Sequence, residues 1–175
     1  MNGKSSGSSS VVVLEKDADF PHWVADYQRQ ATNSVVVSHM GGETLADFEA
    51  RIERRVAELT EELRVAVISC SRFRRGERFS QDDQGAARER ISRMLLARMP
   101  ARGQCELFLV PSTHTDEDEK HAIFELAGAL CDDLRGTSRS VRVRFSFGRP
   151  ESGILPRLAD TQPELLANRA VARRG

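Results

Sequence analysis

Five short apolar runs recur along the chain, and they constrain the fold more than any other feature of the 175-residue sequence. Four of them are continuous and rich in β-branched residues, as is typical of strands buried on both faces of a parallel sheet. The stretches between them place apolar residues every three or four positions, as on one face of a helix. The runs are 11–14, 35–37, 65–68, 107–110 and 141–147, and the expected helices are 21–30, 44–63, 82–99 and 117–135.

This alternation of strand and helix predicts an α/β domain. Helical connections of this length join parallel strands by right-handed crossovers, so helices are expected on both faces of the sheet. We therefore predict three layers around a five-stranded, mostly parallel sheet, the architecture of flavodoxin-like and Rossmann-like domains. The last run alternates Val or Phe with Arg and Ser. One of its faces is thus polar, and we place it at an edge of the sheet.

The length suits one domain of this kind, since a domain usually takes roughly 100–200 residues. We predict that the domain spans residues 10–148. Residues 1–9 are rich in Ser and Gly, which indicates a disordered leader or the remnant of a tag. Residues 149–175 contain three prolines and then Leu165 and Leu166, which indicates a C-terminal tail with a short helix.

The remaining composition favours a cytoplasmic protein without a membrane segment. No apolar run approaches the ~18 residues that a membrane-spanning helix needs, and the polar N-terminus does not resemble a secretory signal. Three cysteines at irregular spacing form neither a disulfide framework nor a zinc motif. The four histidines show no HxH or HExxH spacing, so no metal site is expected.

Basic and acidic residues are equal in number, 26 of each, so net charge predicts neither a nucleic-acid nor a membrane partner. The charges are nevertheless segregated, with acidic blocks at 1–71 and 103–134 and basic blocks at 72–102 and 135–175. Such blocks are typical of solvated helix faces, and they also suit a homo-oligomer or a protein partner. The arginines of the last run lie opposite its phenylalanines, which is the wrong arrangement for stacking on bases, so nucleic acid is not favoured.

Candidate ligand-binding residues follow the third strand. In an open parallel sheet, ligands bind beyond the carboxyl ends of the strands, where the strand order reverses. The phosphate motifs GxGxxG and GxxxxGK[ST] are absent, so the cofactor stays unknown. An arginine-rich loop does occur there, and guanidinium groups bind phosphate and carboxylate well. The candidates for an anionic ligand are Ser71, Arg72, Arg74, Arg75 and Arg78, although Asp82 and Asp83 could neutralise the same arginines.

A second candidate site combines a thiol with an imidazole. Cys70, His39 and His114 all follow predicted strands and so fall at the same edge of the sheet. Nucleophilic catalysis needs a thiolate with a base within hydrogen-bonding reach. The structural alternative is a buried cysteine beside ordinary loop histidines. For Gly41-Gly42, which precedes a helix, we predict a turn with positive φ.

Two classes of function follow from these observations. The expected loops lack a recognised catalytic set, which favours a non-catalytic binding, regulatory or protein-interaction module. The alternative is an enzyme or binding protein for an anionic, phosphate-bearing small molecule held by the loops at the carboxyl edge. Whether the protein is an enzyme stays open at this point. Burial of Cys70 would favour the first class, and a pocket shared by Cys70, a histidine and the arginines would favour the second.

Overall fold

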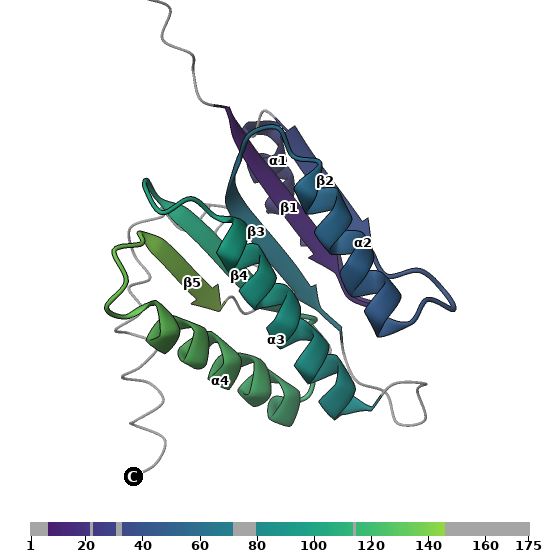
Figure 1. Ribbon diagram of the computed structural model, residues 1–175. Coiled ribbons are helices and arrows are strands. Elements are labelled where there is room, and N and C mark those ends of the chain that lie inside the picture. Colours follow the sequence, from purple (N-terminus) through teal and green to yellow (C-terminus); the bar gives the residue numbers. More distant parts are fainter. Residues whose placement is uncertain (1–6, 22, 31–32, 72–79, 114, 146–175) are drawn as a thin grey trace, which may run out of the picture.

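Five parallel strands form one sheet in the computed structural model, which describes residues 7–21, 23–30, 33–71, 80–113 and 115–145 (Figure 1). The order across the sheet is β2-β1-β3-β4-β5. This is the order of flavodoxin-like sheets, and it confirms the predicted fold class with the last strand at an edge. The strands are β1 (Ser8–Leu14), β2 (Asn33–Ser38), β3 (Glu62–Cys70), β4 (Cys105–Pro111) and β5 (Val141–Phe145).

Helices cover both faces of this sheet, as predicted. The helices α2 (Leu45–Ala57), α3 (Gln81–Arg98) and α4 (Glu117–Leu134) lie on the near face in Figure 1, and the short helix α1 (Val24–Gln30) lies behind. A right-handed crossover that moves across the sheet in one direction must pass over one face, and a crossover in the other direction over the opposite face. Only the step from β1 to β2 runs opposite to the others. The helix that makes this connection, α1, therefore lies on the opposite face of the sheet from the other three.

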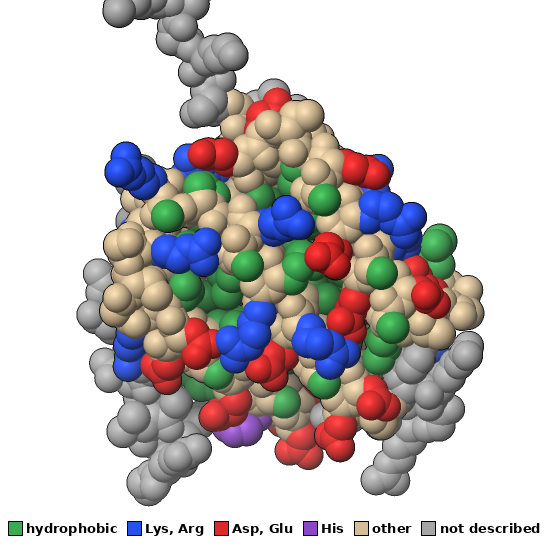
Figure 2. Space-filling view, viewed as in Figure 1, with side chains coloured by type: hydrophobic (Ala, Val, Ile, Leu, Met, Phe, Trp, Pro, Cys, Tyr) green, Lys and Arg blue, Asp and Glu red, His purple; other side chains and the backbone are tan. Residues whose placement is uncertain are grey.

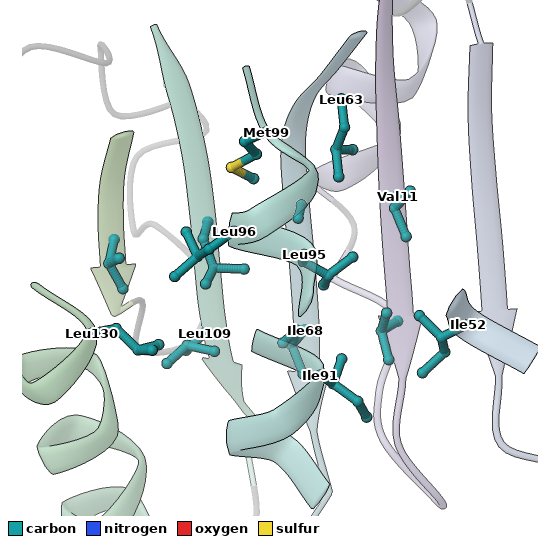
Figure 3. Packing of buried hydrophobic residues seen from close by; sticks show 14 of the residues in the cluster. Val11, Ile52, Leu63, Ile68, Ile91, Leu95, Leu96, Met99, Leu109 and Leu130 are labelled. Carbon is teal, nitrogen blue, oxygen red and sulfur yellow. The ribbon is translucent and has the colours of Figure 1, made fainter. Parts of the chain in front are cut away.

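The hydrophobic core is divided unequally between the two faces. The larger cluster packs the near face of the sheet against α2, α3 and α4, with Ile52, Leu95 and Leu130 from these helices (Figure 3). The smaller cluster lies on the α1 side and contains Val24 and Phe108. Among the described helices, none is long and apolar enough to cross a membrane.

Two predicted boundaries are wrong by a few residues. The helix predicted for 44–63 ends at Ala57, and Leu63 lies in β3 with 3% of its surface exposed. The predicted leader, 1–9, overlaps β1, because Ser8 and Ser9 pair with Glu62 and Leu63. Pairing between β1 and β3 therefore determines both boundaries. The spacing of Leu63 alone fits the helix, and the composition at Ser8 and Ser9 alone is typical of a linker. Residues 1–6 and the tail 149–175 lie outside the described residues.

Polar side chains cap the starts of α2 and α4, and the predicted glycine turn is confirmed. The Thr44 side chain accepts a hydrogen bond from the Asp47 backbone N–H at 3.1 Å and so caps α2. Gly42 adopts a φ of +81°, the left-handed conformation expected for the turn before this helix. Asp116 caps α4 in the same way. These caps hold the helix starts at the carboxyl edge of the sheet.

Candidate functional site

The carboxyl edge between β1 and β3 is where the strand order reverses, and a buried ion pair lies there. Glu15 directly follows β1, and Arg88 reaches toward it from α3. The guanidinium group of Arg88 donates from Nε to Glu15 Oε1 at 2.7 Å and from Nη2 to Oε2 at 2.7 Å. Only 3% of Arg88 is exposed. Bidentate geometry of this kind makes a strong and orienting interaction.

Two further groups complete this network. The Ser71 backbone N–H donates to Glu15 Oε2 at 2.8 Å, and the Ser71 hydroxyl lies 3.0 Å from the same oxygen. Arg88 Nη2 also lies 3.4 Å from Glu119 Oε1, a buried carboxylate in the first turn of α4. The network therefore joins the ends of β1 and β3 to α3 and α4.

Opposing charges keep Arg88 ionised in this buried place. Burial by itself lowers the pKa of Arg88, but Glu15 and Glu119 beside it more than offset this effect and raise the pKa above its ordinary value. A charge so buried is stable only while its partners stay in place. Glu15, Arg88 and Ser71 therefore form a cluster at this edge whose members are hydrogen-bonded to one another.

A second set of hydrogen bonds ties the loop after β1 to β3 and β4. The Ser69 hydroxyl donates to the Asp19 carbonyl at 2.5 Å. The hydroxyl groups of Ser112 and Thr113 each lie 3.2 Å from Asp19 Oδ2. The polar groups of this edge thus bind one another across three strand ends.

A small pocket opens beside the ion pair, between the first turn of α2 and the first three turns of α3. Leu45, Phe48, Ala87 and Ile91 supply its apolar wall. The polar lining comprises Glu15, Lys16, His39, Ser71, Gln84 and Arg88.

The thiol and imidazole of the second candidate site lie in different surroundings. Cys70 is fully buried in the larger core cluster, and burial raises the pKa of its thiol to about 12. At neutral pH the thiol therefore carries its proton, whereas a nucleophilic cysteine needs a lowered pKa. His39 lines the pocket instead, with its ring edge-on to Phe48 at 5.1 Å between centroids. His114 lies outside the described residues.

The arginines of the predicted anion site lie outside the described residues. Their role stays a prediction, and they are Arg72, Arg74, Arg75 and Arg78. Ser71 is described, and its backbone N–H and hydroxyl both contact Glu15.

The alternating charge blocks pair with one another in space. Arg90 on α3 binds Glu49 on α2 with its Nη2 2.6 Å from Oε1, and Arg93 on α3 binds Asp133 on α4. Figure 2 shows basic and acidic side chains interleaved over this face of the molecule. Internal pairing therefore accounts for a part of the segregation in the sequence.

The sequence analysis did not identify Arg88 and Glu119, the charged residues that α3 and α4 contribute to the network. The position of each residue on its helix could have indicated its role. Arg88 lies three residues before Ile91 and seven before Leu95, and Glu119 lies four residues before Ile123. Each thus occupies a position on the buried stripe of its helix, where a charge requires a buried partner.

The comparisons with known proteins add no assignment to this site. Searches against protein-family models, curated proteins and solved structures find no match to the chain. Within the described ranges, no group of three or more His, Cys, Asp or Glu side chains is arranged to hold a metal ion.

Proposed function

We propose that this α/β domain is a non-catalytic protein-interaction module. The observation that carries the proposal is the network of Glu15, Arg88 and Ser71 at the carboxyl edge. In a sheet of this order that edge is the usual place for a reactive or ligand-binding group. Here both carboxylate oxygens of Glu15 are bound by Arg88 and Ser71, so the most strongly charged groups serve the fold.

The neighbouring groups support the same proposal. Asp19 binds Ser112 and Thr113, and the protonated thiol of Cys70 belongs to the core. Catalysis by nucleophile and base requires such groups to face a substrate. A cytoplasmic location is part of the proposal, because the three cysteines are unpaired and such thiols persist in a reducing compartment.

A second candidate function is the binding of an anionic small molecule in the pocket. Lys16 and His39 both line it and supply a cation and a hydrogen-bonding imidazole. The sequence that follows Ser71 adds Arg72, Arg74, Arg75 and Arg78. Guanidinium and ammonium groups suit a phosphate or carboxylate.

Thermal unfolding against a ligand panel separates the two functions. The panel comprises nucleotides, sugar phosphates, coenzymes and short oligonucleotides. A compound at one hundred times its Kd adds about 2.7 kcal/mol of stability, which raises the Tm of a chain of this size by roughly 5–11 °C. For an interaction module, we expect no compound to raise the Tm by more than about 1 °C.

A compound that does raise the Tm would overturn the first proposal in favour of the second. In that case the variant Lys16→Ala should lose the shift. The matched control is Lys120→Ala, which removes a lysine of α4 that pairs with Glu117 and does not line the pocket. Equal loss in both variants would indicate general attraction of anions and would contradict the pocket as well.

A further inference from the structure

The face of the sheet that α1 covers continues across β4 and β5. Leu109 of β4 and Val143 of β5 belong to the larger core cluster on the near face. Successive side chains of a strand point to opposite faces, so Phe108 and Arg144 point to the α1 face. Their contact agrees with this assignment, because Arg144 Cζ lies 6.0 Å from the centre of the Phe108 ring. On the α1 face, a cation of β5 thus lies beside an aromatic ring of β4.

A buried ion pair occupies this part of the face. Arg144 Nε donates to Glu106 Oε1 at 3.0 Å, and Nη2 lies 2.9 Å from the same oxygen. Only 5% of Arg144 and 7% of Glu106 are exposed. Because β5 is an edge strand, a side chain on its face has a neighbouring strand on one side only. Burial of charged groups to this degree at an edge requires a further layer of chain over β4 and β5.

The described helices do not supply this layer. Among them only α1 lies on this face, and Figure 1 shows it behind β1 and β2, away from β5. The core cluster on the α1 side has described members from β1, β3 and β4 and none from β5. Trp23, which directly precedes α1, extends the cover as far as Phe108, with 5.1 Å between the ring centroids. The α1 face of β5 is therefore a docking surface for a segment beyond the described residues.

We propose that residues 149–175 of the same chain dock on this face and cover the ion pair. The described part of the chain ends at Phe145, the last residue of β5, so this segment begins close to the edge strand itself. A chain that turns back from β5 toward β4 moves across the sheet in the same direction as the step from β1 to β2. The right-handed rule that places α1 on its face directs such a chain over the same face.

The sequence of this segment suits the position. Residues 164–174 contain no proline or glycine, and their apolar side chains recur four positions apart, as on one face of a helix. A helix over this range spans about 16.5 Å, and the five residues of β5 span about the same length. Such a helix is therefore long enough to cover β5 from end to end. The apolar positions are Leu166, Ala167, Ala170 and Val171.

Hydrogen–deuterium exchange of the full chain, followed by mass spectrometry, tests the docking. Backbone amides within 164–174 should exchange at least about tenfold more slowly than those of an unstructured chain, because a docked helix must detach before they exchange. The protection should be the same at about 1 µM and about 100 µM chain, since docking within one chain does not depend on concentration.

Leu166→Glu places a charge on the apolar side of the segment and should abolish this protection. It should also raise exchange in β5 by at least about threefold, whereas exchange in β2, at the opposite edge of the sheet, should not change. The Tm should fall by about 3–6 °C. Asn168→Glu is the matched control, because it places the same charge on the polar side of the same predicted helix. It should leave the exchange and the Tm at their wild-type values.

Several results would overturn the inference. Rapid exchange throughout 164–174 in the wild-type protein would mean that the segment does not dock. Protection that appears only at high concentration would assign the face to a second copy of the chain. Equal effects of the two glutamate variants, or faster exchange in β2 in place of β5, would place the segment elsewhere. The inference does not rest on the proposed function, because none of these results depends on whether a ligand raises the Tm.

Discussion

The carboxyl edge of the sheet and the outer edge of β2 are built in opposite ways. The first is rich in charge, and its charged groups bind one another, as Arg88 binds Glu15 and Glu119. The second is uncharged, and its backbone groups at Val36 point away from the sheet. The charged groups of the carboxyl edge are therefore bound inside the domain, whereas the outer edge of β2 is an uncharged run of valines and serines. The predictions below test each half of this comparison.

The largest effect should follow from breaking the ion pair at the carboxyl edge. Arg88→Met removes the cation and leaves Glu15 and Glu119 buried without it. Loss of one partner of a buried pair costs about 3–5 kcal/mol, because the remaining charge is not compensated. Urea unfolding should show this loss in the free energy of unfolding. Arg90→Met is the matched control on α3. It removes a solvent-exposed ion pair with Glu49 on α2 and should change stability little.

A double variant shows whether charge or packing is responsible. Glu15→Leu combined with Arg88→Met removes both members of the bidentate pair, so it should be more stable than Arg88→Met alone. If the double variant were less stable than the single one, packing of the Arg88 side chain rather than its charge would hold this edge together.

The second prediction compares neighbouring residues on the two faces of β2. Val37 is buried against α2, with 1% exposed, whereas Val36 is exposed. Val37→Ala should reduce the free energy of unfolding of the monomer by about 2 kcal/mol, because it leaves a cavity in the core. Val36→Ala should change it by less than about 0.5 kcal/mol. Equal losses at low protein concentration would mean that Val36 is packed in the monomer and that the edge is closed.

The layered fold could be predicted from the sequence because its signals are local. Runs such as Val11–Leu14 and the three- and four-residue spacing of Phe48, Ile52 and Val56 each determine one element. The order of the strands could not be predicted, because connection rules restrict the topology without selecting one order. The limits of elements depend instead on distant pairing. Leu63 fits the helical pattern, and only its pairing with Ser9 places it in β3.

The candidate site was harder to predict, because its groups come together from distant positions. Glu15 and Arg88 are 73 positions apart, and nothing local indicates that they meet. The second edge of the sheet could not be identified for a related reason. The sequence directs attention to the last strand, which does lie at an edge, although Arg144 there is buried and bound to Glu106 on β4. Only the strand order reveals β2 as the other edge.

The third prediction uses the pH dependence of the buried thiol at the centre of the sheet. Burial raises the pKa of Cys70 from 9.0 to about 12 in the folded state. The folded chain therefore keeps a proton that the unfolded chain loses, so the stabilisation is full below pH 9 and is lost as the pH rises toward 12. The slope from this group approaches about 1.4 kcal/mol per pH unit. Urea unfolding between pH 8 and pH 10.5 measures it.

Cys70→Ala is the comparison for this slope. The variant will be less stable at every pH because of the cavity it leaves, but its free energy of unfolding should fall less steeply above pH 9. Cys105 and Cys131 remain in both proteins, and their pKa values are also raised by burial, so they contribute equally to both curves. Parallel curves would show that Cys70 ionises in the folded state, and the thiol would then return as a candidate nucleophile.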